Sequence, residues 1–422
     1  MIYNETPYNS HWETKKLDSL GEFARGKSKH RPRNDSRLFQ GGGYPLVQTG
    51  EVKNANLYIR NHTVEYNDFG LAQSKLWDKG TLCITIAANI AETGILEYPM
   101  CFPDSIVGFN AYETETTEYF MHYIFTFIRQ HIQKSVVGSI QDNINLEYLQ
   151  NLDFKIPEKP YQDKIVRVLK TIDDRIELNY KIEEELDSLG RLLFNYWFVQ
   201  YEFPNEQGKP YKSSKGKMKV DEKTKAEIPE HWELCKLSQI VKNDTSSVSP
   251  RNMQGKMMEH YSIPAYDENV YPAFEAGESI ESNKYRVFSD AILVSKLNPQ
   301  FKRVWDPYCL TDDAICSTEF LVCRPFEQSM RPFCHAVINS DLFSAYMASK
   351  ATSSTGSRKR IQPEVCMEYT FPMPDTKVLK DFIKVYTPIM NRLKDAKKEN
   401  YELVQLRDWL LPLLMNGQVV VE

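Results

Sequence analysis

The chain has 422 residues, which is long enough for two or three domains that each bury a core of their own. Hydrophobic residues make up 41% and aromatic residues 12%, a composition that excludes a disordered protein. The net charge of -5 excludes a chain that is basic throughout, so any contact with nucleic acid must come from local basic patches.

No stretch has the pattern of a signal peptide or a membrane span. The first residues, MIYNETPYNSHW, contain neither a basic segment nor an apolar run, and about 18 consecutive apolar residues occur nowhere. The eight cysteines are scattered singly, without a CxxC pair or closely spaced histidines. This pattern predicts reduced, mostly buried thiols and no zinc site. We therefore expect a cytoplasmic protein.

The first candidate functional segment is the basic stretch RGKSKHRPR, which precedes three consecutive glycines. By itself the stretch fits a solvated surface loop and a loop on a phosphate backbone equally well. Its clustering in an acidic chain favours the second, because each neutralised phosphate releases counterions and contributes affinity. The candidate DNA-binding residues here are Arg25, Lys27, Lys29, Arg31 and Arg33.

Short apolar runs then predict buried strands within residues 44–50, 81–87 and 105–111, because Gly, Asn or Pro bounds each of them. A helix is predicted over residues 117–134. This is the pattern of a mixed α/β domain.

The stretch from Tyr161 to Gln200 predicts one long helix. Its apolar residues recur at spacings of three and four, which is typical of a coiled-coil seam. At 1.5 Å per residue, about 40 residues make a rod of roughly 60 Å. The predicted seam residues are Ile165, Val168, Ile172, Ile182, Leu186, Leu189 and Leu193. The lysine-rich stretch 203–230 has no periodicity and predicts a linker.

The same pattern recurs at the C-terminus at a constant offset of 217 residues, where LKDFIKVYTPIMNRLKD begins the second long helix. Its predicted seam residues are Phe382, Val385, Ile389, Leu403, Leu406 and Leu410. The front of the repeat is His11-Trp12-Glu13, which His231-Trp232-Glu233 repeats.

The chain is therefore predicted to be two copies of one unit, each a mixed domain followed by a long helix. The predicted fold class is α+β, with two mixed α/β domains joined by two long helices that pack as an antiparallel coiled coil about a pseudo-twofold axis. The predicted segments are residues 1–157, 158–202, 203–230, 231–374 and 375–422.

The second copy repeats the order of the first, with strands predicted within residues 290–297 and 317–325 and a helix over residues 330–350. Its long helix contains Pro388 and Pro412, and an interior proline removes a helical hydrogen bond. We expect this helix to begin or bend near Pro388 and to fray near Pro412.

A second basic patch lies in SSTGSRKRI, whose counterpart in the first copy is VGSIQDNIN. Arginine can pair with guanine, and glutamine or asparagine with adenine, through two hydrogen bonds in the major groove. Such side chains are also ordinary loop residues, so both interpretations stay open. The candidates are Gln141, Asn143, Ser357, Arg358, Lys359 and Arg360.

Two motifs only approach catalytic ones. Asn298-Pro299-Gln300-Phe301 is near the NPP(Y/F) motif of amino-methyltransferases, but no glycine-rich turn for S-adenosylmethionine accompanies it. Pro103-Asp104 is not followed by the (D/E)xK of a metal-dependent nuclease. The sequence therefore predicts a chain without a catalytic site.

Several stretches together carry a family resemblance: RGKSKHRPRN, YPLVQTGEVK, SKLNP, STEFLVCRP, and FPNEQGKPYKSSKGKM leading into IPEHWE. With the repeat, they make nearly the whole chain resemble the DNA-specificity subunit of type I restriction-modification enzymes. These stretches add the candidate DNA-binding residues Gln48, Thr49, Lys53 and Lys296, and Arg303, which follows SKLNP, is a further candidate.

The resemblance implies that each mixed domain reads one half-site of a bipartite, asymmetric DNA sequence, while the helices hold the domains a fixed distance apart. It implies two methyltransferase subunits, which carry S-adenosylmethionine, and motor-nuclease subunits, which use ATP and Mg²⁺. This chain would bind no cofactor itself. The alternatives are a coiled-coil interaction adaptor with incidental DNA contacts and, less in keeping with the residues, an enzyme in its own right.

Overall fold

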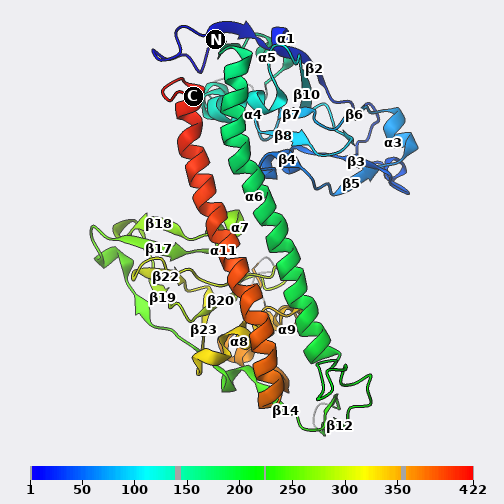
Figure 1. The fold of residues 1–422 in the computed structure, drawn as a ribbon, viewed down its shortest axis with the longest axis vertical. Helices are drawn as coiled ribbons and strands as arrows, with labels where there is room; N and C mark the ends of the chain where they lie inside the picture. Colours follow the sequence, from blue (N-terminus) through cyan, green and yellow to red (C-terminus); the bar gives the residue numbers. More distant parts are fainter. Residues whose placement is uncertain (1, 138–143, 223–224, 353–357, 422) are drawn as a thin grey trace. The chain divides into compact units, whose positions relative to one another are not determined.

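The computed structural model divides into two compact units. Unit 1 comprises Met1–Leu178 and Glu402–Glu422, and unit 2 comprises Asn179–Tyr401. Each unit therefore holds one mixed α/β domain and a part of both long helices (Figure 1). The structure describes residues 2–137, 144–222, 225–352 and 358–421.

The domain of unit 1 is built on a five-stranded sheet in the order β2-β10-β7-β8-β4 and a four-stranded sheet in the order β5-β3-β9-β6. A separate antiparallel pair, β1 and β11, joins its two ends. The strands are β1 (Glu13–Lys16), β2 (Gly21–Arg25), β3 (Tyr44–Leu46), β4 (Tyr58–Ile59), β5 (Val64–Tyr66), β6 (Leu76–Trp77), β7 (Leu82–Thr85), β8 (Thr93–Leu96), β9 (Met100–Cys101), β10 (Ile106–Ala111) and β11 (Asp153–Ile156). The three predicted strands are confirmed as β3, β7 and β10.

The predicted helix of this domain is confirmed as α4 (Glu118–Val137), whose aromatic face lies in the core. Phe120 and Phe125 of α4 are fully buried with Phe109 of β10 and with Leu411 and Leu414 near the C-terminus. The end of the second long helix is thus part of the core of unit 1. The short helices are α1 (Leu17–Leu20), α2 (Thr49–Asn54), α3 (Asp68–Ala72) and α5 (Leu146–Gln150).

Unit 2 has a four-stranded sheet in the order β15-β23-β20-β21, a five-stranded sheet in the order β16-β19-β22-β17-β18, and two strand pairs. The strands are β12 (Met218–Val220), β13 (Glu227–Pro229), β14 (Glu233–Lys236), β15 (Val241–Asn243), β16 (Ser247–Val248), β17 (Met257–Tyr261), β18 (Ala273–Ala276), β19 (Lys284–Arg286), β20 (Ile292–Ser295), β21 (Val304–Trp305), β22 (Ala314–Ser317), β23 (Phe320–Pro325) and β24 (Thr370–Met373). The helices are α7 (Ile263–Asn269), α8 (Arg331–Ile338), α9 (Asp341–Lys350) and α10 (Pro363–Met367).

The two strands predicted in unit 2 are confirmed as β20 and β23, but the single helix predicted over residues 330–350 is wrong. It is divided into α8 and α9, because the hydroxyl of Ser340 accepts a hydrogen bond from the backbone N–H of Phe343 and starts a new helix. A serine at this position competes with helix continuation in the way that N-cap residues do.

The two domains are closed by the same strand pair. In unit 1, Glu13 pairs with Ile156 across β1 and β11, and in unit 2 Glu233 pairs with Met373 across β14 and β24. Both pairs are antiparallel, four residues long and placed at the two ends of a domain. The predicted internal repeat is therefore confirmed in three dimensions.

The stretch predicted to be a featureless linker is instead folded where the structure describes it. Strands β12 and β13 form an antiparallel pair. Phe203 stacks between Tyr211 and Trp232, with ring centroids 4.6 and 4.9 Å away. The three rings bury apolar area that a flexible linker would expose.

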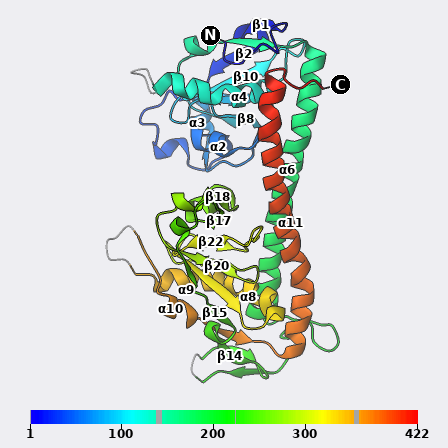
Figure 2. The same ribbon diagram turned by 90° about the vertical axis from the view of Figure 1, so that its left-hand side faces the viewer.

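Both predicted long helices are present, as α6 (Lys159–Phe194), which continues into a π-helical turn over Asn195–Val199, and α11 (Thr376–Met415) (Figure 1, Figure 2). In unit 1 the side chain of Asp173 pairs with Arg407, and Tyr161 reaches the carbonyl of Val419.

In unit 2, Glu183 pairs with Asn400, and Gly190 lies against the ring of Tyr386. As the number rises along α6 it falls along α11, so the helices run antiparallel in each unit. Glu183 and Asn400 are also 217 residues apart, so each contacts its own equivalent in the other copy. Such a contact is expected where a twofold axis passes between two helices.

Part of the predicted seam is wrong. Leu189, Val385 and Leu406 are exposed by 48%, 47% and 43%. The predicted seam residues Ile165, Ile172, Phe382 and Ile389 are buried. The rest of the interior is filled by unpredicted residues at equivalent positions of the two copies: Leu169 and Tyr386, Asn179 and Ala396, Phe194 and Leu411, Trp197 and Leu414. The exposed leucines fit a heptad count equally well, which is why spacing alone chose them.

The second helix does not begin near Pro388, because α11 begins at Thr376 and runs through Pro388 and Pro412 to Met415. A bend near Pro388 stays a prediction. Lys384 and Pro388 are both exposed, so the carbonyl that loses its helical partner faces solvent. Solvent therefore reduces the cost of the proline.

Six of the eight cysteines are buried and all eight are unpaired thiols, as the prediction of mostly buried thiols required. Of the helices in the described part of the chain, none combines the length and the apolar character that crossing a membrane demands.

Candidate nucleic-acid interface

The basic stretch of unit 1 forms the loop that follows β2. Its backbone is fixed to the segment after β9, because Gly26 donates to the carbonyl of Ile106 and Lys27 to that of Phe102. The side chains of Lys27 and Lys29 are exposed. Arg25, the last residue of β2, is exposed as well. The predicted cations are therefore presented to solvent by a backbone that the sheet holds in place.

The two later arginines of this loop have partners within the domain. Arg33 donates two hydrogen bonds to the carboxylate of Asp104, at 2.8 and 2.9 Å. Arg31 donates to the carbonyls of Ser28 and His30, at 2.6 and 2.8 Å. Arg33 is half exposed, so water screens its ion pair. These contacts order the loop and occupy the two arginines. The exposed Lys27 and Lys29 are therefore its more available charges for a phosphate backbone.

Gln48, Thr49 and Lys53 lie at the start and within the short helix α2. The backbone N–H of Gln48 donates to Glu51, which fixes the first turn of the helix. Gln48 and Lys53 are exposed, whereas Thr49 is half-buried. Strand β3, which precedes them, pairs with β9 at Cys101, and Lys27 of the basic loop donates to the carbonyl of the next residue, Phe102.

The candidates Gln141, Asn143 and Ser357 lie outside the described residues. Their assignment as base-contacting residues stays a prediction.

In unit 2 the structure brings together two candidate segments that lie about 60 residues apart in the sequence. Asn298 donates its backbone N–H to the carbonyl of Lys359, and the backbone N–H of Lys359 donates to the side chain of Asn298. Ile361 then donates to the carbonyl of Lys296. The SKLNP and RKR stretches, which the sequence could not connect, therefore form one surface.

The charges of this surface are arranged around Glu319. Arg360 donates three hydrogen bonds to the Glu319 carboxylate, the shortest at 2.7 Å. Burial lowers the pKa of Lys296 from its ordinary value, while the charge of Glu319 opposes that shift. Arg358 and Lys359 are exposed. They are the outermost cations of this surface.

Arg303 is turned away from solvent, with 13% of its side chain exposed. It donates to both oxygens of Asp267, at 2.6 and 2.8 Å, and its guanidinium lies 5.7 Å from the centroid of the Phe301 ring. Its charge is therefore neutralised within unit 2.

Sequence reasoning missed Asn298 and Phe301 as parts of this surface, because it weighed their motif only against a methyltransferase. Asn298 has a φ of +49°, a left-handed conformation that asparagine adopts more readily than most residues. Phe301 is 59% exposed, which is unusual for a phenylalanine in a loop of small and polar residues. An Asn-Pro pair followed by an aromatic residue is the signal that could have indicated an exposed turn.

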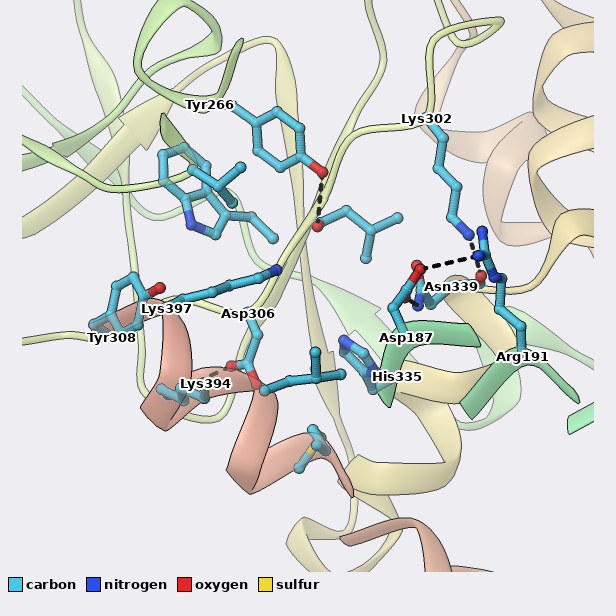
Figure 3. A pocket seen from close by; sticks show the side chains of 15 residues that line it. Asp187, Arg191, Tyr266, Lys302, Asp306, Tyr308, His335, Asn339, Lys394 and Lys397 are labelled. Atoms are coloured by element: carbon cyan, nitrogen blue, oxygen red, sulfur yellow. Dashed lines mark hydrogen bonds and ion pairs between the residues drawn. The ribbon is translucent and has the colours of Figure 1, made fainter. Parts of the chain in front are cut away.

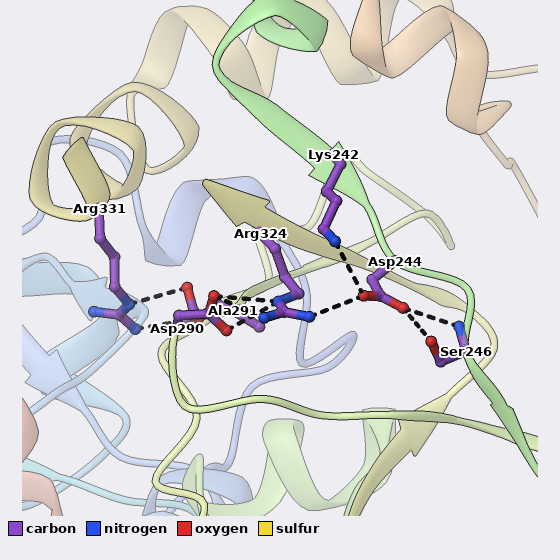
Figure 4. A network of polar contacts seen from close by, with 7 residues as sticks. All are labelled: Lys242, Asp244, Ser246, Asp290, Ala291, Arg324 and Arg331. Atoms are coloured by element: carbon purple, nitrogen blue, oxygen red, sulfur yellow. Dashed lines mark hydrogen bonds and ion pairs between the residues drawn. The ribbon is translucent and has the colours of Figure 1, made fainter. Parts of the chain in front are cut away.

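The loop of unit 2 that corresponds to the basic loop of unit 1 carries an acid instead. Asp244 follows β15 and accepts hydrogen bonds from Ser246 and from Arg324, which also pairs with Asp290 (Figure 4). Burial alone would raise the pKa of Asp244, but the hydrogen bonds from Ser246 and Arg324 lower it below the usual range. The acid of this loop is therefore held by cations of its own unit.

Within the described residues, no three His, Cys, Asp or Glu side chains gather in a way that could hold a metal ion. The site that can be built from the structure is a pair of cationic loop surfaces, one on each mixed domain.

The comparisons with known proteins agree with one family. Residues 9–188 match the family model described as type I restriction modification DNA specificity domain. The chain is 25% identical over 246 residues to the type I restriction enzyme MjaIX specificity subunit of Methanocaldococcus jannaschii, a match that covers 57% of this chain and 54% of that protein. It is 22% identical to the HindI specificity subunit of Haemophilus influenzae, over 95% of this chain and 98% of that protein.

Among solved structures, the S subunit of a type I restriction-modification system from M. genitalium covers 98% of this chain and 99% of its own, with a TM-score of 0.60 and 14% sequence identity. At this identity the likeness shows a shared fold. The chain spans about half the length of the MjaIX subunit and nearly the whole length of the HindI subunit.

Proposed function

We propose, from the premise that this chain belongs to the specificity subunits of type I restriction-modification enzymes, that it reads a bipartite, asymmetric DNA sequence. Each mixed domain, called a recognition domain from here on, reads one half-site. The observation that carries the proposal is that two copies of one fold present different side chains on their loops. A repeated fold with divergent loops suits the reading of two different short sequences.

The cations divide between two tasks in this proposal. Lys27 and Lys29 in unit 1, and Arg358 and Lys359 in unit 2, contact phosphates and fix the register of the protein on DNA. Base edges are read by polar side chains beside them, because phosphate contacts carry no sequence information directly. Among the described residues, Gln48 is exposed at the N-terminal end of α2 and is the first candidate for this second task.

The second part of the proposal is that the long helices bind partner subunits. Leu189 and Leu192 are exposed by 48% and 63% on α6 within unit 2. Their equivalents at the 217-residue offset, Leu406 and Trp409, are exposed by 43% and 63% on α11 within unit 1. Large apolar side chains exposed at matching positions of both copies suit two copies of one partner.

These partners would be two methyltransferase subunits, which carry S-adenosylmethionine and modify adenine at N6. Motor-nuclease subunits, which use ATP and Mg²⁺, would join the assembly for restriction. This chain would supply the reading surfaces and the docking surfaces, and the chemistry would lie in its partners.

The test is DNA binding and methylation by the chain assembled with its methyltransferase subunit. Mapping methylated adenines across the genome of a host that expresses both should give one bipartite sequence. Exchange of residues 11–157 for another recognition domain should change one half of that sequence and leave the other. Equal affinity for the bipartite site and for scrambled DNA at one fixed salt concentration would refute the proposal.

The exposed apolar residues also fit an interaction adaptor whose DNA contacts are incidental. The same domain exchange separates the two functions. An adaptor would keep its partner subunits after the exchange and would show no change in the methylated sequence.

A further inference from the structure

Each recognition domain contacts a long helix through a largely buried polar cluster, and the charges are reversed at one equivalent pair of positions: Arg60 meets Glu177 in unit 1, whereas Asp306 meets Lys394 in unit 2. We call the cluster in unit 1 contact 1 and the cluster in unit 2 contact 2.

In contact 1 the helix supplies the acids. Asp173 and Glu177 lie one turn apart on α6 and are 0% and 8% exposed. The recognition domain supplies the donors: Arg60 pairs with Glu177, and the hydroxyl of Tyr123 donates to Asp173 over 2.6 Å. Asn56 also donates to Asp173, at 3.3 Å.

The second helix completes contact 1. Arg407 of α11 donates to Asp173 over 2.8 Å and to the side-chain oxygen of Asn56. Asp173 therefore accepts hydrogen bonds from the recognition domain and from Arg407 of α11. A buried carboxylate of this kind depends on every one of its donors.

In contact 2 the helix supplies a base. Lys394 of α11 is the equivalent of Glu177 at the 217-residue offset, and it donates to the carbonyl of Pro307 at 2.6 Å. It also lies 3.4 Å from the carboxylate of Asp306 (Figure 3). The equivalent of Asp173 is Met390, whose sulfur lies 3.6 Å from the guanidinium of Arg331.

The domain side of contact 2 supplies one acid, Asp306, together with the cation Arg331. Asp306 pairs with Arg331 at 2.5 Å as well as with Lys394. Burial alone would raise the pKa of Asp306, but the charges of Arg331 and Lys394 lower it below the usual range. Arg331 is itself fixed by the carbonyls of Asp290 and Ala291 (Figure 4).

We propose that these reversed charges key each recognition domain to its own helix, so that the two domains cannot exchange places. The first domain placed in unit 2 would set Arg60 against Lys394 and the hydroxyl of Tyr123 against Met390. The second domain placed in unit 1 would set Asp306 against Glu177. A like-charged pair in a partly buried contact costs stability, because neither charge can be fully hydrated there.

The consequence for DNA reading rests on the proposed function. If each domain reads one half-site, the key fixes which half-site is read from which copy and hence the order of the two half-sites. The DNA-facing loops of the two domains could then diverge, while their helix-facing residues preserve the order of the two half-sites.

The test uses full-length chains in which the first domain occupies both positions. Residues 13–156 replace residues 233–373, with both junctions in the equivalent strand pairs that close the two domains. In this chain Lys394→Glu should raise the thermal midpoint by on the order of 5 °C, because it gives Arg60 a carboxylate partner. In the natural chain the same substitution should lower the midpoint by a similar amount, because it sets a second acid against Asp306.

Lys384→Glu is the matched control, because Lys384 is exposed on the same helix. It should shift both chains equally and slightly. The reciprocal chain, with residues 233–373 in both positions, should be stabilised by Glu177→Lys. This second chain keeps the test possible if the first duplicated chain does not fold. If Lys394→Glu shifts the midpoint in the same direction in both chains, or if neither substitution restores a folded duplicated chain, the key is refuted.

The DNA readout is separate from the stability readout. The stabilised chain with two first domains, assembled with its methyltransferase subunit, should methylate a site made of two copies of one half-site. A reversed stability effect without any such change in the methylated sequence would support the key and refute the proposed function.

Discussion

The two units share a fold but present their cations on different loops. In unit 1 they come from one continuous loop after β2, whereas in unit 2 they come from the segment after β20 together with residues 358–361. The position that Lys296 occupies in unit 2 is taken in unit 1 by Ile86, which makes the corresponding backbone contact with Ile144. One backbone therefore supports two different surfaces.

The interiors of the domains did not diverge in this way. His122 of α4 and His335 of α8 occupy corresponding positions, two residues after Phe120 and Phe333. Burial lowers the pKa values of the two histidines to about 3 and about 4. Both imidazoles are neutral at physiological pH and hydrogen-bonded, His122 to Thr93 and His335 to Tyr386. The comparison shows that the interior fixes the scaffold and that the loops are free to specify what is read.

The largest expected effect is a change in the DNA spacer, produced by lengthening α6 and α11 while the loops of both units stay unchanged. Insertion of seven residues into both α6 and α11 preserves the heptad phase and lengthens each helix by about 10 Å. If the units read independently, the preferred spacer should grow by about three base pairs, while both half-sites stay the same. Mapping of methylated adenines measures both quantities. An unchanged spacer would contradict the proposal that helix length determines it.

The next effect should be confined to the half-site read by unit 2. Arg358→Ala with Lys359→Ala removes its two outermost cations, so the slope of log affinity against log salt should fall by about two. Binding titrations of the assembled complex at several salt concentrations measure this slope. The half-site read by unit 1 should keep its sequence preference, and a loss of preference in both half-sites would show that the units are not independent readers.

Sequence reasoning found the elements of both units because strands and long helices leave local patterns, as at residues 82–85 and 118–137. It placed part of the helix seam wrongly because Leu189 and Leu406 satisfy the heptad spacing as well as the buried residues do. The buried positions include Asn179 and Asn400, which no apolar pattern could indicate.

The candidate interface was less predictable than the fold. The contact between Asn298 and Lys359 joins segments about 60 residues apart, and it depends on sheet register. The pairing of Arg303 with Asp267 is equally non-local, so the sequence could identify a cation but not whether its charge is available. Composition predicts that a loop is basic, and only the tertiary structure shows which of its charges are already paired.

A smaller effect should distinguish paired from unpaired cations within the basic loop of unit 1. Arg31→Ala with Arg33→Ala should lower DNA affinity and flatten its salt dependence by about one unit of slope, because Asp104 already neutralises Arg33. Lys27→Ala with Lys29→Ala should flatten it by about two. Titration of both double variants over the same salt range makes the comparison, and an unchanged slope in both would place the loop away from the DNA backbone.

The smallest effect concerns the point where the two copies meet, at Glu183 and Asn400. Burial raises the pKa of Glu183 to about 7, although Lys397 and the hydrogen bond from Asn400 oppose the shift. Tyr308 also lies close enough for its own pKa to respond to Glu183.

Because the folded chain favours protonated Glu183, the stability that this group contributes is present below pH 4.5 and is lost as the pH rises through 7. Glu183→Gln keeps the neutral form at every pH. It should therefore stabilise the chain at pH 8 by on the order of 1 kcal/mol, or roughly 2–4 °C in thermal midpoint, and have little effect near pH 4.5. Glu184→Gln, on the exposed side of the same helix, is the matched control and should show no such pH dependence. An equal shift for Glu183→Gln at both pH values would mean that the contact between the two copies does not titrate, and that its hydrogen bond persists with Glu183 ionised.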